Sequence, residues 1–282
     1  MFRGNAMTIQ STSSSTDFFR SMTREDITQS LRRLRSVFQG NYGHNPIIED
    51  GRFIGRTTMQ GNVVHVTFRG SVNSAFEIAS CINMRKIILD DVGIEGQVHA
   101  GIYSAFTKIK NTIVDHINHF SQISQTKPKD LTYIIEGYSR GSGLATLVAV
   151  YLAHKFTPDR LGVLTFSSMN ILSEQAAHDY TNKIGKNNHL NFTCLEDLVP
   201  KLITPGRLGF SPVGEALLFS ANESPSFEKR VAMRQYTYLA DQIIIATVVK
   251  TVVSASTWEA HMPQTYEEGA PKVFERYIAS KL

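Results

Sequence analysis

The chain has 282 residues, of which 42% are hydrophobic and 19% are charged, and its formal net charge is +4. This mixture excludes a disordered or fibrous protein, and the length suits one large α/β domain. Two cysteines, Cys81 and Cys194, are too few for a disulfide framework, and no apolar run reaches the roughly eighteen residues of a transmembrane segment.

The N-terminal part of the chain predicts a flexible leader over residues 1–22, followed by a single domain over residues 23–282. Residues 8–16 form a polar tract rich in Ser and Thr, and the leader lacks the continuous apolar stretch of a secretion signal. We therefore expect a cytoplasmic protein, or one exported without a cleaved signal peptide. Apolar residues then recur at helical spacing from Ile27, which predicts a helix. A basic group on this predicted helix is interpreted as a solvated helix face, with contact to an anionic lipid surface as the alternative. The basic group consists of Arg32, Arg33 and Arg35.

Predicted strands and helices alternate through the middle of the chain. The strands are expected at residues 63–68, 131–136, 161–166 and 190–194, and the helices at residues 102–123 and 142–156. Strand–helix–strand units of this size pair their strands in parallel. The pattern therefore predicts an α/β fold with a mostly parallel sheet and helices on its faces.

Two later segments are harder to interpret. Residues 203–241 contain several prolines and glycines and predict a long loop or mobile flap. Residues 243–253 are rich in β-branched residues, so a strand and a buried helix are equally good interpretations.

Ser139 lies in a G-x-S-x-G sequence at the point where a predicted strand meets a predicted helix. A sharp turn there lifts the serine hydroxyl clear of the sheet and directs the following backbone N–H at a reacting carbonyl. Gly137 and Gly141 fit this turn, because it strains the backbone and brings neighbouring elements close together. We therefore interpret Ser139 as a nucleophile.

A serine nucleophile needs an imidazole to take its proton and a carboxylate to orient that imidazole. Asp197 follows the predicted strand at residues 190–194, and His261 is the one histidine after Asp197 in the sequence. The order Ser, Asp, His is that of α/β-hydrolase-type folds, and histidine suits proton transfer near neutrality. We interpret Asp197 and His261 as the other two members of a triad, with a turn residue and a surface loop residue as the alternatives.

Two backbone N–H groups are candidates for binding the negative charge of a tetrahedral intermediate. One belongs to Arg140, directly after the nucleophile. The other belongs to Ser71, at the end of the predicted strand over residues 63–68, where Gly70 permits a tight bend. The alternative for Ser71 is a simple turn residue.

Five segments resemble, in one order, the class 3 lipases, the fungal-type triacylglycerol lipase group of the α/β-hydrolase superfamily. The segments are Val66–Ser71, Val98–Ile102, Gly137–Gly141, Asn191–Leu202 and His261–Tyr266, and the resemblance covers about residues 45–270. The resemblance implies an α/β-hydrolase fold with helices on both faces of the sheet. It also implies cleavage of carboxylic esters of lipids, glycerides or phospholipids, through an acyl-enzyme intermediate and without a cofactor.

The chain departs from the family pattern at four places. Tyr138, Arg140 and Ser142 replace His, Leu and Gly, and residues 167–170 replace Gly-x-Pro-Arg. The Arg140 side chain is expected to form an ion pair with Glu136, with a phosphate head group as the alternative partner. The departures also leave open a non-catalytic lipase-like interaction module and a soluble short-chain or aryl esterase.

The expected partners are a lipid ester substrate and, transiently, a membrane or lipid surface. Residues 71–97 lie where class 3 lipases carry a mobile lid, and an ordinary helix is the alternative there; residues 203–230 are a rival flap. No metal or nucleic-acid site is expected, because His116 and His119 lack metal-binding companions and basic residues are not interleaved with aromatic ones.

Overall fold

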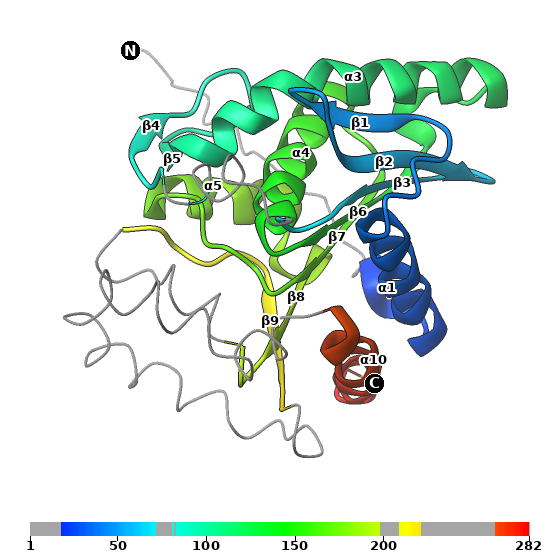
Figure 1. Ribbon diagram of the computed structural model, residues 1–282, viewed down its shortest axis with the longest axis vertical. Helices are drawn as coiled ribbons and strands as arrows, with labels where there is room; N and C mark the ends of the chain where they lie inside the picture. The colour runs from blue at the N-terminus through cyan, green and yellow to red at the C-terminus, as the bar shows by residue number, and fades with distance from the viewer. Residues whose placement is uncertain (1–17, 72–80, 82, 198–208, 221–262, 282) are drawn as a thin grey trace, which may run out of the picture.

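A mixed sheet forms the centre of the protein in a computed structural model, which describes residues 18–71, 81, 83–197, 209–220 and 263–281 (Figure 1). The sheet has seven strands in the order β1-β2-β3-β6-β7-β8-β9. They are β1 (Pro46–Glu49), β2 (Arg52–Gln60), β3 (Val63–Phe68), β6 (Thr132–Tyr138), β7 (Arg160–Phe166), β8 (His189–Cys194) and β9 (Glu215–Phe219). β2 pairs antiparallel with both β1 and β3, and all later pairs are parallel. The predicted mostly parallel α/β sheet is therefore confirmed.

Helices cover both faces of this sheet (Figure 1). The α-helices are α1 (Arg24–Phe38), α3 (Ala100–Ser124), α4 (Arg140–Phe156), α5 (Glu174–Ile184) and α10 (Pro263–Ala279), and the short 3-10 helices are η1 (Phe18–Ser21), η2 (Pro128–Asp130) and η3 (Lys186–Asn188). A small second sheet pairs β4 (Lys86–Ile88) with β5 (Gln97–His99). None of the described helices has the length and apolar character needed to cross a membrane.

Alternating side chains of the strands divide the core into two clusters, as the twofold repeat of a strand requires. On β7, Val163 packs with α3, α4 and α5, whereas Leu164 and Phe166 pack with α1 and α10. Each face thus has its own hydrophobic core, and the carboxyl ends of the parallel strands are left between the two helical layers.

Three predictions need correction. Phe18 and Phe19 lie within the predicted flexible leader, yet both are buried against the sheet in η1. β9 occupies part of the predicted loop at residues 203–241, since its parallel pairing with β8 stabilises a strand too short to show a clear pattern. In the segment of residues 71–97, residues 86–88 form β4 rather than the helix given as the alternative to a lid, and Ile88 is 75% exposed; the lid itself stays a prediction.

Several predictions lie outside the described residues. These are the element at residues 243–253, His261, and residues 72–80 and 82 of the lid segment. Apart from the buried residues of η1, the division of the chain into a leader and one domain stays a prediction.

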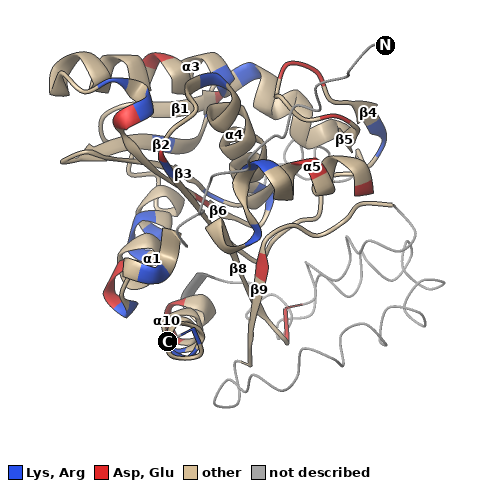
Figure 2. Ribbon diagram, turned by 180° about the vertical axis from the view of Figure 1, so that it is seen from behind, with Lys and Arg blue, Asp and Glu red and all other residues tan. Residues whose placement is uncertain are grey.

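The arginines of the basic group on α1 form ion pairs with carboxylates. Figure 2 marks the basic and acidic positions along this helix. Arg32 pairs with Glu25 at 3.0 Å and Arg35 pairs with Glu267 at 3.3 Å, and both arginines are at least half exposed. Arg33 differs, because its side chain is only 20% exposed and it pairs with a buried carboxylate of the sheet. The expected solvated face therefore describes two of these three arginines.

Candidate active site

Ser139 occupies a strained turn between β6 and α4, with φ 51° and ψ −121°. Positive φ is costly for a residue with a side chain, so the surrounding structure must hold it in place. The Ser139 N–H donates to the carbonyl of Phe166 at 2.9 Å, and the N–H and hydroxyl of Ser142 donate to the Ser139 carbonyl at 2.9 and 2.5 Å. The predicted sharp turn is present, and hydrogen bonds on both sides fix it.

Gly137 and Gly141 are required by close packing. A Cβ atom at Gly137 would collide with the carbonyl group of Gly141, and one at Gly141 would lie 2.5 Å from the carbonyl oxygen of Arg69. Neither glycine has a positive φ, so the strained backbone angle of the turn belongs to Ser139 itself.

Ser142, which departs from the family pattern, connects the turn to the segment after β7. Its hydroxyl oxygen accepts a hydrogen bond from the N–H of Met169 at 2.9 Å while the hydroxyl donates to the Ser139 carbonyl. A glycine at this position would have no group to make this connection.

Asp197 is completely buried just after β8. Its Oδ2 atom accepts hydrogen bonds from the hydroxyl of Ser167 at 2.6 Å and from the hydroxyl of Tyr266 at 2.7 Å. Burial, together with the charge of Asp197, raises the pKa of Tyr266 well above its usual value, so Tyr266 stays a neutral donor. Sequence reasoning did not assign these two donors to Asp197.

Tyr266 joins the surroundings of Asp197 to those of Ser139. It lies near the start of α10, and its ring packs edge-on against Tyr138, the neighbour of Ser139, with ring centroids 5.5 Å apart. His261 itself lies outside the described residues, shortly before α10 begins at Pro263.

His189 is a buried histidine at the start of β8, at the opposite end of that strand from Asp197, and its ring has other partners. Its Nε2 atom lies 2.8 Å from the hydroxyl of Thr165, and its Nδ1 atom lies 3.0 Å from the hydroxyl of Tyr180. Burial lowers the pKa of His189 to about 3, so the ring is neutral. We therefore assign His189 a structural role.

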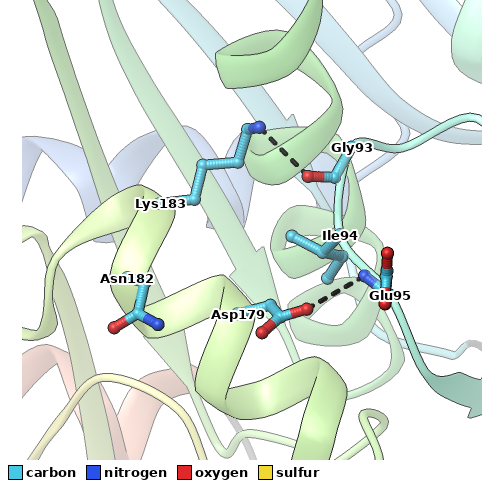
Figure 3. Close-up of a pocket in the computed structure, with 6 residues that line it drawn as sticks. All are labelled: Gly93, Ile94, Glu95, Asp179, Asn182 and Lys183. Carbon is cyan, nitrogen blue, oxygen red and sulfur yellow. Dashed lines mark hydrogen bonds between the residues drawn. The ribbon is translucent and has the colours of Figure 1, made fainter. Parts of the chain in front are cut away.

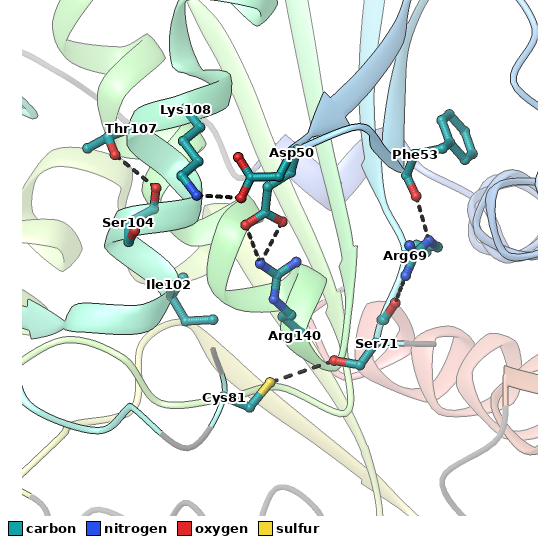
Figure 4. A network of polar contacts seen from close by, with 12 residues as sticks. Asp50, Phe53, Arg69, Ser71, Cys81, Ile102, Ser104, Thr107, Lys108 and Arg140 are labelled. Carbon is teal, nitrogen blue, oxygen red and sulfur yellow. Dashed lines mark hydrogen bonds and ion pairs between the residues drawn. The ribbon is translucent and has the colours of Figure 1, made fainter. Parts of the chain in front are cut away.

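Ser71 lies beside the turn, at the end of β3. A Cβ atom at Gly70 would lie only 3.1 Å from the Cβ atom of Ser139, so the two segments approach closely at this position. The Ser71 hydroxyl lies 3.7 Å from the thiol of Cys81 (Figure 4).

The model of the class 3 lipase family matches residues 65–206, which is half of the chain. The chain belongs to the class 3 lipase family. It is accordingly a serine ester hydrolase that acts on lipids. No curated protein matches the sequence.

Solved structures of fungal lipases have the same fold as this lipase. A triacylglycerol lipase from Penicillium expansum superposes with a TM-score of 0.56 at 16% sequence identity, covering 70% of this chain and 80% of the other. A lipase from Rhizopus microsporus var. chinensis gives a TM-score of 0.56 at 17% identity, with 72% and 76% covered. The triacylglyceride lipase of Rhizomucor miehei gives 0.52 at 18% identity, with 68% and 77% covered. These similarities confirm the α/β-hydrolase-type fold.

The Arg140 side chain pairs with a different residue from the one predicted. It donates to both carboxylate oxygens of Glu49, at the end of β1, at 2.9 and 2.7 Å (Figure 4). Glu136 instead binds Arg33 and the hydroxyl of Thr67 on the other face of the sheet. Burial opposes the charge of Glu136, but Arg33 beside it holds its pKa well below the usual range.

We expect Glu49→Ala to lower the free energy of unfolding by about 3–5 kcal/mol, because it leaves the buried Arg140 guanidinium without this carboxylate. Urea denaturation followed by circular dichroism measures the change. The matched control is Glu49→Ala combined with Arg140→Leu, which removes both charges and restores the leucine of the family pattern. A single variant that is as stable as the double variant would contradict the expectation.

A surface pocket of about 560 Å³ lies away from these residues, between α5 and the segment before β5 (Figure 3). Its polar groups bind one another: Lys183 donates to the Gly93 carbonyl at 3.0 Å, and the Glu95 N–H donates to Asp179 at 3.1 Å. We assign the pocket no role. Among the described residues, no group of His, Cys, Asp and Glu side chains is arranged to hold a metal ion.

Proposed function

We propose that Ser139, Asp197 and His261 form the catalytic triad of this lipase, with the backbone N–H groups of Ser71 and Arg140 as the oxyanion hole. Ser139 directly follows β6 and Asp197 follows β8, so both lie at the carboxyl edge of the parallel sheet, where catalytic groups gather in such folds. The Ser139 turn is strained and fixed by hydrogen bonds, as a nucleophile turn requires.

The proposal depends on the two contacts that Tyr266 makes. Tyr266 hydrogen-bonds Asp197 and packs against Tyr138, so it ties the start of α10 to the carboxylate and to the neighbour of the nucleophile. His261 shortly precedes α10 in the sequence. Because Tyr266 attaches the start of α10 to Asp197, we expect His261 to lie at the same edge of the sheet.

In the proposed reaction, the Ser139 oxygen attacks the ester carbonyl while His261 takes its proton. The Ser71 and Arg140 N–H groups bind the oxyanion, and His261 then gives its proton to the departing alcohol. Water, activated by the same imidazole, attacks the acyl-enzyme, which releases the fatty acid and restores the Ser139 hydroxyl.

The proposed substrates are glycerides or phospholipids, reached by transient contact with a membrane or lipid surface. Ile88 on β4 is 75% exposed, and the neighbouring Arg85 and Lys86 are exposed as well, which suits an anionic lipid surface. A lid over residues 71–97 and a cytoplasmic or leaderless-exported location stay proposals. Activity that falls steeply with acyl length would favour a short-chain esterase instead.

A fluorophosphonate probe tests the triad directly, because only an activated serine reacts with it at an appreciable rate. We expect one probe molecule to bind per chain, and mass spectrometry of the digested protein to place it on Ser139. Prior unfolding in urea should abolish the labelling, which controls for nonspecific reaction. Labelling of a different serine, or none at all, would overturn the proposed site.

A further inference from the structure

Arg69 is a buried arginine at the end of β3, and its side chain binds two backbone carbonyl groups. Its Nε atom donates to the carbonyl of Phe53 on β2 at 2.8 Å, and its Nη1 atom donates to the carbonyl of Gly70 at 2.7 Å (Figure 4). Only 7% of the residue is exposed. The planar guanidinium group therefore ties the Gly70 carbonyl to the neighbouring strand.

The carbonyl of Gly70 and the N–H of Ser71 belong to the same peptide group. No peptide bond in the described residues is cis, and a trans peptide is planar with its C=O and N–H pointing in opposite directions. A hydrogen bond that fixes the Gly70 carbonyl therefore fixes the direction of the Ser71 N–H as well.

Such a restraint matters because residue 70 is a glycine. A Cβ atom there would lie 3.1 Å from the Cβ atom of Ser139, which is a tight contact, and glycine has more conformational freedom to lose on folding than any other residue. Without an external hold, the peptide between Gly70 and Ser71 has more freedom to rotate. An oxyanion hole works best when its donors are fixed before the reaction, so that no reorganisation is needed in the transition state.

We propose that Arg69 is a positioning residue of the oxyanion hole, which acts by holding the Gly70 carbonyl so that the Ser71 N–H points at the developing oxyanion. This inference rests on the proposed function, in which Ser71 supplies one of the two donors. Arg69 itself does not touch the substrate.

Arg69→Lys tests the proposal, because lysine keeps the positive charge but lacks the planar fork that binds both carbonyls. We expect kcat for a p-nitrophenyl ester to fall by about 10- to 100-fold with KM nearly unchanged, since the donor acts mainly in the transition state. Affinity for an alkyl trifluoromethyl ketone, which forms a tetrahedral adduct with the serine, should fall by a similar factor. Arg52→Lys, a change at an exposed arginine on β2, is the matched control and should leave both values unaltered.

Each rate is divided by the number of reactive serines, which is counted from the final extent of fluorophosphonate labelling, so that misfolded molecules do not contribute. Arg69→Met, measured in the same way, shows whether losing the charge adds to the effect. Unchanged kcat per titrated site in both variants would overturn the role of Arg69, as would a rise in KM with kcat intact. A wild-type protein that is neither labelled at Ser139 nor active would instead overturn the proposed function.

Discussion

Ser139→Ala is expected to lower kcat for lipid esters by about a million-fold, the loss seen when a triad nucleophile is removed. The covalent route requires an oxygen nucleophile in the strained turn, and alanine offers none. Catalysis that survives would come from substrate binding and from the oxyanion hole alone. Initial rates of fatty acid release, measured by titration at constant pH, give the value.

The fold of the Ser139→Ala variant should be intact. The hydrogen bonds that hold the turn use the N–H and carbonyl groups of Ser139, and these groups are retained in alanine. Near-ultraviolet circular dichroism matching the wild type checks this. Ser104→Ala, at an exposed serine on α3, is the matched control and should keep full activity. Ester hydrolysis at the wild-type rate by folded Ser139→Ala would end the case for this nucleophile.

The parts of the fold that could be predicted are those in which the local pattern and the tertiary environment agree. α3 shows a continuous apolar stripe in the sequence, and its buried residues follow that stripe. β9 shows no such pattern, because a five-residue strand with buried Leu217 and Phe219 offers only two apolar positions in register. Its pairing with β8 depends on a neighbour brought close by the fold.

The candidate site likewise has a part that the sequence predicts and a part that it does not. The Ser139 turn is a local event, so a strand, a G-x-S-x-G sequence and a helix are enough to predict it. Glu49 is 91 residues from Arg140 in sequence, and no local signal joins the two side chains. Ser167 and Tyr266 reach Asp197 from two elements far apart in the sequence, one from the end of β7 and the other from α10. Such contacts follow from topology, which periodicity in the sequence does not specify.

Asp197→Asn is expected to lower kcat by about ten-thousand-fold, the effect of the equivalent change in a serine protease triad. An asparagine can still accept the hydrogen bonds from Ser167 and Tyr266 through its amide oxygen, so both buried hydroxyls keep their acceptor. What the amide lacks is the negative charge that holds the imidazole in the productive tautomer and stabilises it when protonated. We therefore expect a folded protein with a slow chemical step, measured as kcat for the same lipid ester.

Labelling kinetics separate this role of Asp197 from a purely structural one. With the nucleophile present but poorly activated, the fluorophosphonate should reach the same endpoint in Asp197→Asn as in the wild type, at a much lower rate. Loss of structure would lower the endpoint instead. Asp159→Asn, at an exposed aspartate before β7, controls for the change of charge and should label at the wild-type rate. If Asp197→Asn also labels at that rate, another residue must orient the base, and the tie from Tyr266 to Asp197 would then serve only to anchor α10.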